Sequence, residues 1–214
     1  MRKFTGVLII AMTMAFVVAA SSRADAALIL QLQETGFAPV QVTSLTGLAT
    51  FSGAYGDYMV NVDTGVSKPM LGTAGSPQMD LNFITVTSGT PAANLVLSLT
   101  DTGFTGVGGG TLKFGGTTDG TASYAAFWSA TNLPFAMTNQ FDGTITGTGA
   151  FSGSGFGAGP GAGPYSLTQV ITIHQPAGNH VASGDANLVV PEPATMALFG
   201  MGLLGLAARR RRVV

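Results

Sequence analysis

Apolar and polar residues alternate along much of the chain in short runs with a period of two. Because successive side chains of a strand point to opposite faces, each run predicts a strand with one buried face. The clearest runs cover residues 28–33, 95–99 and 165–174. Thr100 is predicted to face outward, and Gln169, on the apolar face of the third run, to mark a strand edge. The residues predicted for the core are Leu28, Leu30, Leu95, Leu97, Leu99, Ile171 and Ile173.

Further candidate strands follow at short intervals, separated by turn-forming residues. They cover residues 40–44, 58–62, 81–87, 121–129, 144–148 and 186–190. Glycines such as Gly53, Gly115 and Gly116 mark predicted turns between them. No alternation of helix and strand patterns, which is typical of a parallel sheet, is present. The sequence therefore predicts an all-β body over residues 27–189, folded as an antiparallel, jelly-roll-like β-sandwich.

Residues 147–164 differ from their surroundings. Eight of these 18 residues are glycine, and only Phe151 and Phe156 have large side chains. Such a composition is typical of a flexible loop, which is the interpretation we favour. The alternative is a segment that self-associates through its aromatic residues.

The N-terminus has the three parts of a signal peptide. Arg2 and Lys3 precede an uncharged run over residues 6–20, and Ala24 and Ala26 then form the A-x-A pattern that signal peptidase accepts. The uncharged run is shorter than the roughly 20 residues that a membrane anchor needs. We therefore predict a signal peptide over residues 1–26, with cleavage between Ala26 and Ala27.

The C-terminus, residues 190–214, has a second apolar run in a different context. Its two prolines predict an extended, protease-accessible hinge, because neither can donate a backbone hydrogen bond. The uncharged residues 194–208 predict a single transmembrane helix, and the basic cluster after it would stay in the cytoplasm by the positive-inside rule. The hinge consists of Val190, Pro191, Glu192 and Pro193, and the cluster of Arg209, Arg210, Arg211 and Arg212.

This order of a Pro-Glu-Pro hinge, a short apolar span and a terminal arginine cluster resembles the PEP-CTERM sorting signal of Gram-negative bacteria. The resemblance covers about 25 residues and implies that an exosortase, a membrane-embedded transpeptidase, recognises and processes the tail. Segments of the body, among them residues 99–104 and 165–174, are similar to β-rich proteins that carry this signal. That similarity implies no activity for the body.

Charge is distributed unevenly. Between Ala27 and Pro191 there are eight acidic residues but only two basic ones, Lys68 and Lys113, which leaves a net charge of −6. A body of this sign repels the phosphate backbone, so nucleic acid is not an expected partner. The chain has no cysteine, which excludes disulfides and thiolate metal sites.

Candidate catalytic and metal-binding residues are few. His174 and His180 flank a predicted turn and could face each other across a hairpin, but two ligands are too few for a defined metal site. Asp57, Asn61 and Asp63 offer oxygen ligands for Ca²⁺ at a spacing that matches no calcium loop. We therefore predict no cofactor and no metal. Residues predicted to serve turns instead are Asp101, Asp119 and Asp142.

One aromatic cluster stands out, formed by Tyr124, Phe127 and Trp128. In a strand, Tyr124, Ala126 and Trp128 share one face, and we predict that this face belongs to the core. The alternative is a platform on which a sugar ring stacks.

Together these patterns favour a non-enzymatic structural or adhesive protein of the cell surface or the extracellular biofilm matrix. The alternative function is a carbohydrate-binding module of the exopolysaccharide matrix. We expect export across the inner membrane, anchoring there by the C-terminal helix, and release to the cell surface or the exterior after processing. The expected partners are an exosortase, the inner membrane and, for the alternative function, exopolysaccharide.

Overall fold

The computed structural model describes residues 27–87, 94–191, 198 and 201, which contain eleven strands. The pairings between these strands are antiparallel, which confirms the predicted all-β, antiparallel class. In chain order the strands are β1 (Leu28–Glu34), β2 (Val40–Ser44), β3 (Leu48–Tyr55), β4 (Tyr58–Val66), β5 (Gln78–Thr87), β6 (Leu95–Phe104), β7 (Gly110–Ser129), β8 (Asn139–Gln140), β9 (Ile145–Gly157), β10 (Tyr165–His174) and β11 (Val181–Val189).

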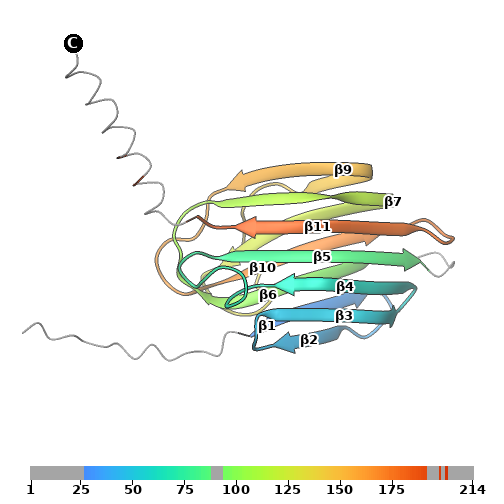
Figure 1. The fold of residues 1–214 in the computed structure, drawn as a ribbon, viewed down its shortest axis with the longest axis horizontal. Helices are drawn as coiled ribbons and strands as arrows, with labels where there is room; N and C mark the ends of the chain where they lie inside the picture. Colours follow the sequence, from blue (N-terminus) through green and yellow to red (C-terminus); the bar gives the residue numbers. More distant parts are fainter. Residues whose placement is uncertain (1–26, 88–93, 192–197, 199–200, 202–214) are drawn as a thin grey trace, which may run out of the picture.

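The long strand β7 gives the sheet its shape. It pairs with β11 through residues 111–118 and with β10 through residues 121–129, so it passes from one half of the sheet to the other. The front half contains β9, the first part of β7, β11, β5, β4 and β3 (Figure 1). The back half contains the second part of β7, β10, β6, β1 and β2.

The two halves enclose one core and nearly close into a barrel. Strand β3 packs against β1 and β2, so the two ends of the sheet approach each other. The layers of the expected sandwich are therefore two parts of one continuous sheet that folds over at β7. All seven residues predicted for the core are at most 1% exposed, which confirms the period-two prediction.

Two polar residues were misplaced by the sequence pattern. Thr100 does not face solvent, because residues 130–138 cover it: its Oγ1 donates to the carbonyl of Leu167 at 3.0 Å and accepts the N–H of Phe135 at 3.1 Å. Gln169 does not mark an edge, because β10 lies between β6 and β7. Its fully buried side chain donates Nε2–H to the carbonyl of Met79 on β5 at 3.1 Å, so it links the two halves.

The predicted glycine-rich loop over residues 147–164 is wrong for most of its length. Residues 145–157 form β9, which pairs with both parts of β7. Gly53 and the Gly115–Gly116 pair, predicted as turns, likewise lie within β3 and β7. In each case the glycine belongs to a strand. The residue types alone did not distinguish glycines in turns from glycines within strands.

The glycines of β9 are required by close packing at the fold of the sheet. A Cβ on Gly153 would lie 2.5 Å from Ile145 Cγ2, and one on Gly157 would lie 0.9 Å from the carbonyl oxygen of Phe141. Gly147, Gly153, Gly155 and Gly157 recur at even spacing, so they fall on the inner face of β9. The space beside them is already filled by Ile145, Phe151 and residues 141–142, as expected where other groups approach a strand closely.

The predicted targeting segments lie mostly outside the described residues. These are the signal peptide at residues 1–26 and, apart from Leu198 and Met201, the apolar run 194–208 with the arginines after it. Among the residues that the structure describes, no helix is long and apolar enough to cross a membrane.

Candidate functional site

The sorting tail leaves the body directly after β11. Val190 is fully buried, and its N–H donates to the carbonyl of Pro77 at 2.9 Å. Pro191 follows directly and is half-buried beside Gly108. Glu192, Pro193 and Arg209–Arg212 lie outside the described residues, as do Ala24 and Ala26, while Ala27 is the first residue described. Of the predicted hinge, Val190 thus belongs to the folded body.

A buried ion pair holds the β4–β5 loop at the same end of the body. Lys68 Nζ lies 2.9 Å from Asp101 Oδ2 and 4.0 Å from the ring centroid of Phe104. The hydroxyl of Ser67 donates to the same carboxylate oxygen at 2.8 Å. Burial lowers the pKa of Lys68, and the charge of Asp101 opposes that shift. Asp101 is therefore not a turn residue, as the sequence predicted, but a fully buried partner within β6.

The outer face of the front half carries a shallow cleft of about 760 Å³. Its walls come from four neighbouring strands, and its polar residues stand opposite one another in register. Gly115 leaves the backbone bare at its floor. The polar residues that line the cleft are Asp80, Lys113, Ser152, Ser154, Asp185 and Asn187.

Two carboxyl groups meet in this cleft. The side chains of Asp80 and Asp185 are hydrogen-bonded, and burial together with the charge of Asp185 raises the pKa of Asp80 to about 6, while Asn187 opposes the shift. Asp80 is therefore half-protonated near pH 6, because burial and the neighbouring carboxylate both disfavour its charged form. The two residues are diagonal neighbours on β5 and β11, where Asp80 stands opposite Asn187 and Asp185 stands opposite Asn82.

This pair was missed at the sequence level, although a signal for it exists. Asp80 and Asn82 alternate with buried residues along β5, as Asp185 and Asn187 do along β11. Polar residues at every second position predict that each of the two strands has one polar face. Only the pairing of β5 with β11 brings these residues together.

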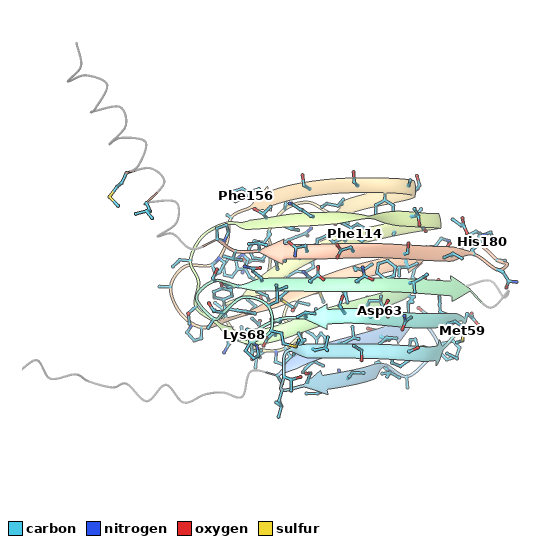
Figure 2. The ribbon with its side chains drawn as sticks, viewed as in Figure 1. Met59, Asp63, Lys68, Phe114, Phe156 and His180 are labelled. Carbon is cyan, nitrogen blue, oxygen red and sulfur yellow. The ribbon has the colours of Figure 1, made fainter. Side chains whose placement is uncertain are left out.

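An exposed aromatic residue lies at the edge of the same half. Phe156 is 67% exposed. The tip of its ring packs directly against the backbone of Gly109, where an added Cβ would lie only 2.3 Å from the ring atom Cζ. The ring is thus supported by backbone on one side and open to solvent on the other. Figure 2 shows Phe156 towards the end of the molecule where the tail leaves, with His180 at the opposite end.

The histidine pair of the sequence analysis is not formed across a hairpin. β10 and β11 belong to different halves of the sheet and do not pair with each other. His174 Nδ1 is hydrogen-bonded to Asn94 Oδ1 at 3.0 Å, and His180 Nδ1 lies 3.6 Å from Asp119 Oδ2. In the described part of the chain, no group of three or more histidine and acidic side chains is placed to hold a metal ion.

The remaining acidic residues have structural partners. Asn61 donates to Asp63 at 2.6 Å, and the N–H of Asp57 donates to Glu34 Oε2 at 3.0 Å. Asp119 lies within β7 rather than in a turn, where its Oδ2 accepts the N–H of Val181 at 2.9 Å. Asp142 does serve a turn, as predicted, because it accepts the N–H of Gly143 at 2.8 Å.

Glu34 is a buried acid that fills the β3–β4 turn. It is 2% exposed, and burial raises the pKa of its carboxyl while the N–H of Asp57 lowers it. Gly56, with a φ of 58°, lies directly over this carboxyl: a Cβ there would be 1.7 Å from Oε2. The carboxyl therefore supports the turn and is not accessible to a ligand.

The aromatic cluster divides between core and surface. Tyr124 and Ala126 are fully buried, as the core prediction required. Trp128 is only partly buried and donates its Nε1–H to the carbonyl of Ala158 at 3.3 Å. Because Tyr124 is enclosed, these residues form no joint platform for a sugar ring.

Comparison with known proteins identifies the tail. A family model for the PEP-CTERM protein-sorting motif matches residues 189–212, which include the hinge and the arginine cluster. Among curated proteins, none matches the chain significantly.

Two solved structures show weak likeness. One is TmCBM61 in complex with β-1,4-galactotriose, at 13% identity, over 64% of this chain and 90% of that one, with a TM-score of 0.32. The other is the enzymatically active domain of tailspike protein 4 from bacteriophage CBA120, at 12% identity, over 65% of this chain and 19% of that one, with a TM-score of 0.33. Likeness at this level carries no functional argument.

Proposed function

The chain is a PEP-CTERM domain-containing protein, and from this premise we propose that it is a structural or adhesive protein, exported and then sorted by an exosortase. The sorting motif at residues 189–212 is the observation that carries the proposal. A signal peptide over residues 1–26 would deliver the chain to the outer side of the inner membrane. The apolar run 194–208 would hold the C-terminus there until processing, with the arginines in the cytoplasm.

The geometry of the tail exit supports this role. Since Val190 is buried and bonded to Pro77, the hinge begins where the fold ends. No flexible linker separates the body from the motif in the described residues, so the processing enzyme would act close to the surface of the body. The jelly-roll-like connectivity of the body is part of the same proposal.

A binding or structural role fits the front-face cleft better than catalysis. Asp80 and Asp185 interact with each other, and the cleft is shallow and open to solvent. A catalytic acid or base works best in a site that excludes water. We therefore propose that the body is not an enzyme.

Two variants of the tail test the sorting proposal. Replacing Pro191, Glu192 and Pro193 with alanine should leave membrane insertion intact, because the apolar run and the arginines remain, but should block processing. Replacing Arg209–Arg212 with glutamine should instead disturb the topology, because the charge bias fixes the orientation of a short span. An epitope inserted at the exposed Gly161 reports where the body resides after fractionation.

The two variants should therefore fail in different ways in a strain with an active exosortase. The triple-alanine chain should accumulate in the membrane fraction, with its body on the outer side. If it is processed and released like the natural chain, the tail is an ordinary anchor and the proposal is wrong.

The front-face cleft favours carbohydrate binding as a second candidate function. Asp185, Asn187 and Ser152 offer several acceptors and donors at the spacing of neighbouring strands, which suits the hydroxyl groups of a sugar chain. Phe156 adds an exposed ring at the edge of the same half, and sugar rings stack on such surfaces. Binding to soluble polysaccharide should be lost in Asn187→Ala and weakened in Phe156→Ala. A change at the exposed Met137 should leave it unaltered.

A further inference from the structure

Strand β9 has an open edge. Among the described strands it pairs only with β7, whereas β2 and β3, which end the two halves, pack against each other. All its residues from Thr148 to Gly157 are exposed or half-buried. An unpaired strand edge presents backbone donors and acceptors that favour pairing with another strand.

The direction of the free backbone groups follows from one hydrogen bond. The N–H of Phe156 donates to Asp142 Oδ2 at 3.0 Å, so it points away from β7. Because backbone groups alternate along a strand with a period of two, the N–H and carbonyl groups of Ala150, Ser152 and Ser154 also point away from β7. Asp142 caps the edge at Phe156, and the bend at Gly149, with a φ of 60°, ends it on the other side. Ser152 is the centre of the open stretch.

Natural proteins usually protect such an edge with charge or proline. Residues 143–184 contain no acidic residue, lysine or arginine, and β9 contains no proline. The body otherwise carries a net charge of −6, so two copies repel each other over most of their surface but not at this edge. The short side chains of Ala150, Ser152 and Ser154 allow two backbones to approach to the spacing of a sheet.

We propose that β9 pairs with β9 of a second copy of this chain, antiparallel and about a two-fold axis at Ser152. This register places Ala150 opposite Ser154 of the second copy and joins the two front halves into one continuous sheet. A two-fold axis satisfies both copies with the same surface, so the contact closes as a dimer. The inference concerns the body and does not depend on the sorting tail.

Disulfide trapping tests the register, because the natural chain has no cysteine. The full chain is held in detergent and treated with a mild oxidant. Ser152→Cys should yield disulfide-linked dimer, whereas Ala150→Cys and Ser154→Cys should cross-link efficiently only when the two variants are mixed. Thr50→Cys, on the exposed face of β3, is the matched control and carries the same tail. Equal cross-linking of Ser152→Cys and Thr50→Cys would overturn the proposal.

Sedimentation of the same full chains tests the affinity. Ser152→Lys places two cations beside the two-fold axis and should raise the dimer dissociation constant about tenfold or more, while Thr50→Lys should leave it unchanged. Monomers at all concentrations of the natural chain, or dimers that persist in Ser152→Lys, would also overturn it. If Ser152→Lys fails to fold, the cysteine variants decide. Loss of the dimer would leave export and sorting unaffected, since every variant keeps the motif.

Discussion

The two lysines of the body show how far environment decides the role of a residue. Lys113 is exposed at the rim of the front-face cleft, whereas the side chain of Lys68 is only 12% exposed and is paired with the fully buried Asp101. A buried ion pair contributes little net stability relative to apolar residues of the same size, but removal of one partner leaves an unpaired buried charge. Lys68 is therefore structurally required, and Lys113 is not.

Loss of the Lys68 ammonium should destabilise the body severely. We expect Lys68→Met to lower the free energy of unfolding by about 3–5 kcal/mol, because Asp101 would be buried without a cation. Lys113→Met, the matched control, should change it by less than about 0.5 kcal/mol. Urea denaturation followed by tryptophan fluorescence measures both. A double variant, Lys68→Met with Asp101→Leu, should recover most of the loss; equal effects of the two single variants would contradict this account.

The carboxyl pair in the cleft makes stability depend on pH. The folded-state pKa of Asp80, about 6, lies above the unfolded value, so the folded state holds a proton that the unfolded chain releases. The stabilisation from that proton is complete below about pH 4 and is lost as the pH rises through 6. Asp185→Asn removes the neighbouring charge and should raise the melting temperature at pH 7 by a few degrees, with a smaller effect at pH 4. A gain of equal size at both pH values would show that the two carboxyl groups do not interact.

At the scale of elements, β9 is the strand whose sequence is most misleading. Its glycines indicate flexibility by composition, yet their even spacing places them where the inner face meets Ile145, Phe141 and Asp142. A strand can contain this much glycine because its pairing with β7 supplies the order that its own side chains do not. Composition and spacing of the same residues thus lead to opposite predictions.

Substitution of one of these glycines separates the two interpretations. Gly157→Ala should destabilise the body by about 1–3 kcal/mol, because its Cβ would overlap the carbonyl of Phe141 and the backbone would have to move. Gly161→Ala, in the following loop with nothing within 4 Å of its Cβ, should be neutral. Thermal unfolding of the two variants gives the comparison. Were both neutral, residues 147–157 would behave as the flexible segment that composition suggests.

At the scale of the whole molecule, the fold begins and ends close to its targeting segments. Leu28, the first residue of β1, pairs with Ser44, and Val190 is buried immediately after β11. Both predicted processing sites therefore lie within a few residues of the folded body. A protease needs an extended substrate, so the order of folding and cleavage matters for this chain.

We expect the mature chain to begin at Ala27, with cleavage before β1 pairs. Replacing Ala24 and Ala26 with leucine should block cleavage, because signal peptidase requires small residues there, and Ser21→Leu should not. N-terminal sequencing of exported chains from the three strains gives the answer. A natural chain that begins at Met1 would contradict both the cleavage site and the proposed compartment.

The sequence alone determined the class of the fold, the core residues and the sorting motif, because each depends on local order along the chain. Leu95, Leu97 and Leu99 need only the period of a strand to fall on one face, and the sorting tail is a contiguous motif. Only the tertiary structure decided which strands become neighbours. Three examples are the two sets of strands that pair with β7, the ion pair of Lys68 with Asp101, and the contact of Asp80 with Asp185. Each joins residues that are distant in sequence, and the periodicity of apolar residues within a strand carries no information on such contacts.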